Sequence, residues 1–118
     1  MNTAAIRMAL QWRVIPEETA AMMSALQTVL VRTRRERGCI SCALSTEIGS
    51  RLEIRYVADW ESEDDLQRHI RSSDFSKLAE LMERGIEPPT IEFALPSGIR
   101  GMDYAEKIRG IRRQAYRH

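Results

Sequence analysis

The chain has 118 residues, of which 43% are hydrophobic and 30% are charged, and this composition predicts a single globular domain. Its 18 basic and 17 acidic side chains leave a formal net charge of +1, which argues against a general nucleic-acid binder, because such proteins carry a large basic excess. No apolar run reaches the ~20 residues of a membrane span, and the N-terminus lacks a signal-peptide pattern, so we expect a cytoplasmic protein.

The first third of the chain predicts a strand followed by a helix. Apolar and polar residues alternate from Ile6 to Val14, which is typical of a half-buried strand. Pro16 favours a helix start, and apolar residues at three- and four-residue spacing predict a helix over residues 16–37. Gly38 follows as the usual residue just beyond a helix C-terminus.

The middle of the chain predicts two strands and a second helical segment. Residues 39–47 and 51–60 flank a glycine turn, which indicates an antiparallel hairpin. Ser62, followed by three acidic residues, is typical of a helix N-cap, and residues 72–74 predict a break in that helix. Residues 90–95, after two prolines, predict a fourth strand.

This order of elements predicts an α+β fold for residues 1–96. Strand, helix, strand, strand, helix, strand is the ferredoxin-like arrangement (βαββαβ), with helices on one face of a four-stranded antiparallel sheet. The other face is left open, and the simplest cover for it is a second copy of the chain, so we expect a homodimer.

Residues 97–118 form a basic extension, with six basic and two acidic side chains. Tyr104, Ile108 and Ile111 stand at helical spacing and predict a short amphipathic helix from about residue 101. Packing of this helix across the dimer is the favoured interpretation. Binding to an anionic partner or a membrane surface, and a solvated extension, are the alternatives.

One stretch of the sequence resembles the antibiotic biosynthesis monooxygenase (ABM) family. The resemblance rests on Trp60-Glu61-Ser62, Leu66, His69, Ser72 and Phe75, with Gly38-Cys39 as a further match. It covers about residues 5–96 and implies a dimeric α+β barrel in which two ferredoxin-like sheets face each other. The family includes cofactor-free oxygenases acting on quinols or polyketide anthrones, and haem-degrading enzymes. The axial histidine of the haem-degrading branch would fall near Ala79, so the sequence disfavours haem degradation.

His69 is the candidate catalytic residue. A cofactor-free oxygenase must deprotonate an electron-rich aromatic substrate, and an imidazole suits a general base near neutral pH. The function predicted is therefore a cofactor-independent monooxygenase with a small aromatic substrate. The alternatives are a structural role for His69, bonded to the loop after the third strand, and a non-catalytic dimeric protein that binds a small ligand or is associated with stress.

Three aromatic residues and one arginine are candidate substrate-binding residues. Trp12, Tyr56 and Trp60 could stack on a flat ring, and core packing is the alternative for all three. Arg55 could hold a phenolate or carboxylate, although an ion pair with Glu53 or Asp59 of a second subunit is the favoured interpretation.

Cys39 and Cys42 form a lone Cys-x-x-Cys pair. On a regular strand, residues three apart point to opposite faces, so the two sulfur atoms are not expected to converge. A zinc site needs four ligands, and no second pair or histidine cluster is present in the sequence. We therefore expect structural thiols and no metal site.

Overall fold

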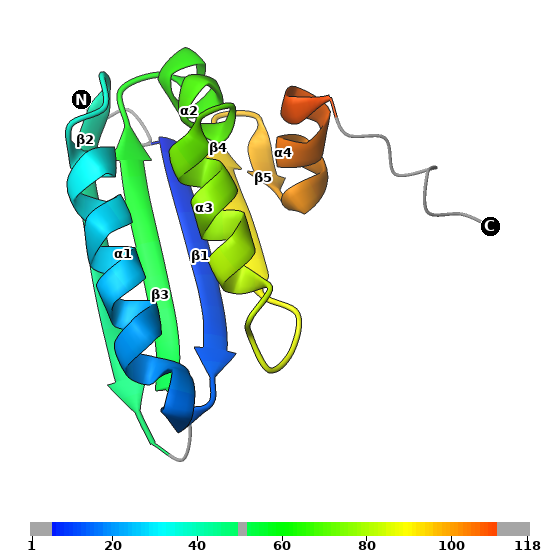
Figure 1. Cartoon of the computed structure of the whole chain (residues 1–118). Helices are drawn as coiled ribbons and strands as arrows, with labels where there is room; N and C mark the ends of the chain where they lie inside the picture. The colour runs from blue at the N-terminus through cyan, green and yellow to red at the C-terminus, as the bar shows by residue number, and fades with distance from the viewer. Residues whose placement is uncertain (1–5, 50–51, 111–118) are drawn as a thin grey trace.

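The computed structural model describes residues 6–49 and 52–110, which form one antiparallel sheet in the strand order β2-β3-β1-β4-β5. Helices cover one side of this sheet (Figure 1). The elements are β1 (Ile6–Val14), a 3₁₀ turn (Pro16–Glu18), α1 (Thr19–Arg34), β2 (Cys39–Ile48), β3 (Leu52–Trp60), α2 (Glu63–Ile70), α3 (Ser73–Met82), β4 (Thr90–Leu95), β5 (Gly98–Arg100) and α4 (Met102–Arg109). The α+β ferredoxin-like order expected from the sequence is confirmed.

The core lies between the sheet and the helices. Strand β1 pairs with β3 so that Leu10 lies opposite Tyr56 and Trp12 lies opposite Ile54, and all four side chains face the helices. Helices α1, α2 and α3 cover them with fully buried residues that include Leu26, Leu66 and Leu78. Burying large apolar side chains of this kind contributes about 1.5–3 kcal/mol each, which makes this face the main source of stability.

One helix end differs from the sequence expectation. The α-helical part of the first helix ends at Arg34, and the Arg35 and Glu36 amides close it with backbone bonds to the carbonyls of Arg32 and Thr33, respectively. The second helical segment breaks as expected, because Ser72 caps α3 through a 3.3 Å bond that its hydroxyl accepts from the Phe75 amide.

The C-terminal part of the described chain extends the sheet and its cover. A fifth strand, β5, pairs with β4, where four strands were expected. Helix α4 then packs on its own chain: Ala105 is fully buried and the Tyr104 ring lies 5.2 Å from that of Phe93. Three residues give too short a pattern to predict a strand. Ile111, the last of the expected helical residues, lies outside the described residues.

A β-bulge at the start of β2 changes the prediction for the cysteines. Cys39 pairs with Trp60, but Ser41 pairs with Asp59, so one extra residue is accommodated between them. Cys39 and Cys42 consequently both occupy positions on the helix-covered face, and the expectation of opposite faces was wrong. Burial raises the pKa of the Cys42 thiol to about 11, and it also raises the pKa of Cys39. Both thiols are free.

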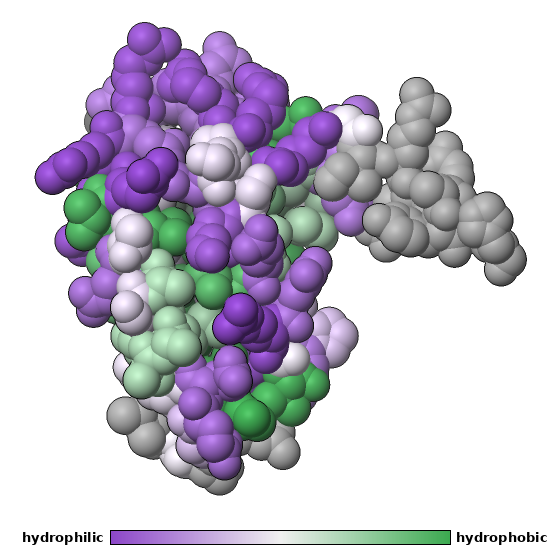
Figure 2. All heavy atoms as spheres, viewed as in Figure 1, coloured by the Kyte–Doolittle hydropathy of each residue, from purple (hydrophilic) through white to green (hydrophobic). Residues whose placement is uncertain are grey.

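The outward side of the helices is mostly hydrophilic, with smaller hydrophobic areas between them (Figure 2). In the part of the chain that the structure describes, no helix combines the length and the apolar character that a membrane crossing requires.

Candidate functional site

His69 lies in the last turn of α2 and is completely buried. The helix starts where it does because the Ser62 hydroxyl accepts a 3.1 Å hydrogen bond from the Asp65 amide, and three acidic residues fill the first turn. Two turns later the helix ends against Ser72, whose hydroxyl donates a 2.6 Å bond to the His69 carbonyl. His69 is thus fixed at a helix end, with its side chain directed into the protein.

Glu36 holds one side of the His69 ring. Nδ1 of His69 lies 3.0 and 2.9 Å from the two carboxylate oxygens of Glu36. A carboxylate accepts hydrogen bonds and does not donate them, so Nδ1 carries the proton. In the neutral imidazole, Nε2 is then the atom with a free lone pair. Within the described residues, Nε2 is buried and has no hydrogen-bond partner.

Two aromatic rings enclose the other side of the imidazole. The Trp60 ring lies 4.9 Å from the His69 ring, tilted by 30°, and Phe75 approaches edge-on at 6.0 Å. Trp60 Nε1 is also buried without a partner among the residues that the structure describes. A bare acceptor and a bare donor therefore sit on neighbouring rings, although buried polar atoms are normally hydrogen-bonded. Such a pair is suited to a ligand group that can donate a hydrogen bond to Nε2 and accept a hydrogen bond from Nε1.

Gly38 allows the turn that carries Glu36 to approach the helix that carries His69. It adopts a left-handed conformation (φ +86°) between Glu36 and the start of β2. Its carbonyl accepts a 2.8 Å bond from the Glu61 amide, and a Cβ at this position would come within 2.2 Å of the Asp65 side chain. A glycine here therefore allows the turn that carries Glu36 to lie directly against the start of α2.

The structure brings only some of the sequence-predicted residues to His69. Trp60 contacts it, whereas Tyr56 lies four residues further along the same strand face and donates a 3.1 Å hydrogen bond to Thr33. Trp12 shares this face but pairs with Ile54, six residues from Trp60 and so about 20 Å away along the strand.

Arg55 lies on the opposite face of the sheet from His69. It is exposed and lines a small pocket of about 180 Å³ together with Gln11, Ser45, Thr46, Glu47 and Glu53. Within one copy of the chain, Glu53 and Asp59 lie 3.8 Å from Arg13 and 2.8 Å from Arg7, respectively, and an ion pair of Arg55 with either acid across a dimer stays a prediction. Arg55 therefore cannot reach a substrate held at His69 within one copy of the chain.

The sequence did not indicate Glu36 as a site residue, and Phe75 stood out only as part of the family resemblance. The signal for Glu36 was an acid that interrupts the basic run of residues 32–37, two positions before Gly38. Among the described residues, no cluster of three or more histidine, cysteine, aspartate or glutamate side chains could hold a metal ion. Ala79, where an axial histidine was considered, lies on α3.

The fold and this buried imidazole define a ferredoxin-like α+β protein with a histidine–carboxylate pair under its second helix. The sequence profile of the antibiotic biosynthesis monooxygenase family matches residues 5–81, and the chain belongs to this family. No curated protein matches the chain significantly.

Solved structures resemble this fold closely. A conserved protein from Methanosarcina mazei is 26% identical, with a TM-score of 0.67 over 75% of this chain and 89% of that one. A candidate antibiotic biosynthesis monooxygenase from Bordetella bronchiseptica is 25% identical, with a TM-score of 0.62 over 79% and 97% of the two chains. Rv0793 from Mycobacterium tuberculosis, at 21% identity, shares the fold with a TM-score of 0.63 over 79% and 95%.

Proposed function

We propose that this chain is a cofactor-independent monooxygenase that oxidises an electron-rich aromatic ring, such as a quinol or a polyketide anthrone, with His69 as the general base. Family membership supports monooxygenase activity. The observation that carries the assignment to His69 is its bare, buried Nε2, held as an acceptor by Glu36. An unsatisfied basic atom in a protein interior is costly, so its persistence favours a role in binding or catalysis.

The proposed chemistry begins with proton transfer to Nε2, from the hydroxyl of a quinol or from the ring CH₂ of an anthrone. The Glu36 carboxylate stabilises the resulting imidazolium, and the Trp60 indole N–H donates to the substrate oxyanion. The electron-rich anion then reduces O₂ itself. For an anthrone, a ring CH₂ becomes C=O: one oxygen atom enters the ring, and the other leaves as water with the two hydrogen atoms lost from carbon.

In this proposal, the substrate reaches Nε2 of His69 from the part of the surface where Glu36 is exposed. The His69 side chain has no exposed surface, whereas that of Glu36 is 20% exposed. Substrate entry therefore requires the segment between α1 and β2 to move relative to α2, after which the closed site excludes water from the reactive anion.

We further propose a homodimer formed by the open sheet face, as is typical of the family. The centre of this face carries small or uncharged side chains at Ala9, Val57 and Ala43, which lie in one row across the sheet. A charged residue in this row, such as Val57→Glu, is expected to give a monomer in light scattering. A dimer unaffected by that change would place the interface elsewhere.

Oxygen uptake by the purified protein with a panel of quinols and anthrones tests the function. We expect uptake to fall at least about tenfold in His69→Ala and in Glu36→Gln, since a positioned base contributes roughly 10²–10⁴ in rate. Glu83→Gln, an exposed carboxylate at the end of α3, is the matched control and should retain full activity. Circular dichroism of each variant separates loss of the base from loss of the fold.

A non-catalytic ligand-binding protein is the second candidate, and the complete burial of His69 favours it. On this interpretation, the Glu36–His69 pair fixes α2 to the end of α1. Absence of uptake with every panel member, from a correctly folded protein, would support this candidate. Protein-dependent uptake that His69→Ala leaves unchanged would keep the monooxygenase and move the base to another residue.

A further inference from the structure

A pocket of about 570 Å³ lies between α2, β5 and α4. Gln67 of α2 forms one wall, and the others come from Ile99, Arg100, Gly101, Asp103, Tyr104, Lys107 and Ile108. Its volume falls within the ~300–1,000 Å³ typical of small-molecule sites. Seven of the eight lining residues follow residue 81, where the family match ends, so this pocket is built mainly from the part of the chain added to the family core.

The aromatic wall of the pocket is held rigidly. The Tyr104 hydroxyl donates a 2.6 Å hydrogen bond to Glu63 and accepts a 3.1 Å bond from the Gln67 amide. Its ring packs at 5.2 Å on Phe93 of β4. Burial and the neighbouring Glu63 raise the pKa of Tyr104 to about 12, so the phenol stays neutral. Tyr104 therefore offers a fixed aromatic surface at little entropic cost to a ligand.

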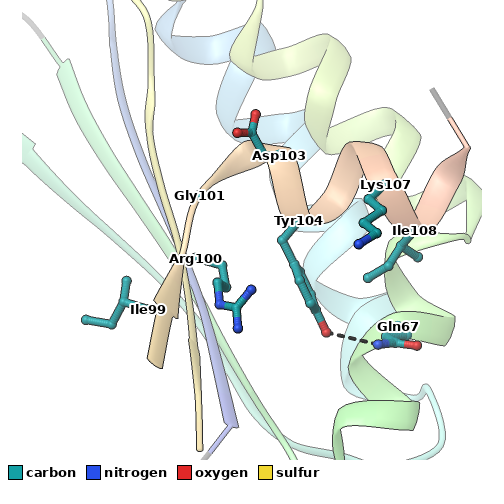
Figure 3. A pocket seen from close by; sticks show the side chains of 8 residues that line it. All are labelled: Gln67, Ile99, Arg100, Gly101, Asp103, Tyr104, Lys107 and Ile108. Carbon is teal, nitrogen blue, oxygen red and sulfur yellow. Dashed lines mark hydrogen bonds between the residues drawn. The ribbon is translucent and has the colours of Figure 1, made fainter. Parts of the chain in front are cut away.

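Two cationic side chains flank that surface. Arg100 and Lys107 lie on either side of the Tyr104 ring, while Asp103 and Ile99 point away from it (Figure 3). Arg100 donates a 3.3 Å hydrogen bond to the Ser97 hydroxyl. Among the residues that the structure describes, neither Arg100 nor Lys107 forms an ion pair. A guanidinium fork and an ammonium group that line one pocket favour an anionic ligand group such as a carboxylate.

Apolar surface completes the pocket beside these charges. Ile108 lies next to Lys107 on α4, and the Tyr104 ring faces the space between the cations (Figure 3). A flat hydrocarbon body can pack on this surface, whereas an inorganic anion would use the two charges alone.

We propose that this pocket is a binding site for a small aromatic carboxylate, whose charged group is held by Arg100 and Lys107 and whose ring lies against Tyr104. The site is separate from His69, because Gln67 and His69 belong to the same helix but face α4 and the sheet, respectively. Its ligand is recognised by residues that the proposed oxidation does not use, so the proposal stands whether or not the chain is an oxygenase.

Titration of the protein with benzoate, followed by protein NMR shifts and calorimetry, tests the site. We expect millimolar or tighter binding, with shifts centred on α4 and the end of α2. Arg100→Gln should weaken binding by about tenfold and Lys107→Gln by a smaller factor, since the fork makes two bonds and the ammonium makes one. Lys77→Gln, which removes an exposed charge from α3, is the matched control and should leave affinity unchanged.

Benzamide and inorganic phosphate complete the experiment. Benzamide keeps the ring without the charge and should bind at least about tenfold more weakly than benzoate. Phosphate binding as tight as that of benzoate would show that charge alone is recognised, and would overturn the aromatic part of the proposal. Failure of benzoate to bind, or binding that Arg100→Gln does not weaken, would overturn the site.

Discussion

The two faces of the sheet are built from the same strands and carry opposite chemistry. The inner face, under the helices, is apolar, and the helices that cover it add a few polar groups such as Thr33 of α1 and His69 of α2, both completely buried. The outer face carries paired charges, among them Arg7 with Asp59 at 2.8 Å. Since successive strand residues point to opposite faces, neighbours in sequence belong to different environments. A polar group buried at the inner face therefore requires a hydrogen-bond partner or a functional role, whereas a polar group on the outer face can be solvated by water.

Neighbouring substitutions on β3 should show the largest contrast between the faces. Ile54→Ala removes a completely buried side chain and should lower the free energy of unfolding by about 2–5 kcal/mol. Arg55→Ala, one residue further on the outer face, should change it by less than about 0.5 kcal/mol in the monomer. Urea denaturation at equal, low protein concentration measures both. Equal losses for the two variants would contradict the assignment of faces.

The buried hydrogen bond between Tyr56 and Thr33 should show the next largest effect. Thr33→Val leaves the tyrosine hydroxyl without this acceptor, at a cost of about 1–3 kcal/mol in unfolding free energy. Adding Tyr56→Phe removes both polar partners and should recover part of that loss. Thermal unfolding of the two single variants and the double variant gives the comparison. Additive losses would mean that the two hydroxyls do not depend on each other.

Alkaline pH should weaken the protein through the same tyrosine. Burial raises the pKa of Tyr56 above its ordinary value, so the folded state keeps a proton that the unfolded state loses above pH ~10. Stability is therefore complete below pH ~10 and falls above it, by about 1.4 kcal/mol for each pH unit. Denaturant unfolding between neutral pH and pH ~11 measures the fall. Tyr56→Phe should reduce its slope; an unchanged slope would assign the fall to other groups, such as Tyr104.

The ion pair on the outer face should show the smallest effect. Arg7 and Asp59 are joined by two hydrogen bonds of 2.8 and 3.1 Å, but the arginine side chain is 48% exposed. A double-mutant cycle with Arg7→Ala and Asp59→Ala should give a coupling energy of about 0.2–1 kcal/mol, which falls as salt is added. A coupling above about 2 kcal/mol, insensitive to salt, would mean that this face is desolvated in the protein as it exists.

The regular alternation of apolar and polar residues made the strands predictable, whereas an irregular strand pairing could not be predicted. The pattern from Ile6 to Val14 predicted β1 with its observed bounds, and Ser62 and Ser72 marked the starts of α2 and α3. The bulge before Ser41 could not be predicted from the sequence, because counting positions along a strand assumes that every residue pairs with one partner residue. Cys39 and Cys42 were therefore assigned to opposite faces of the sheet.

The candidate site could be predicted only in part. Trp60 and His69 stood out as residue types at a recognisable spacing, and the structure places their rings 4.9 Å apart. The contact of Glu36 with His69 depends on the turn at Gly38, whose left-handed conformation brings the end of α1 close to α2. Trp12 lies on the same face of the sheet as Trp60, but the sequence carries no information about the distance between residues on different strands.

The bulge in β2 also bears on how the protein avoids self-association through its sheet edges. Strand β2 is one edge of the sheet and has ten residues, whereas β5 at the other edge has three. A long, flat edge offers free backbone groups to any incoming strand and can seed fibrils. The extra residue, Ile40, interrupts the hydrogen-bonding pattern of β2 near its start, and a bulge of this kind increases the local twist. The irregularity that misled the cysteine prediction is thus of the kind by which proteins make an edge strand a poorer template for an incoming strand.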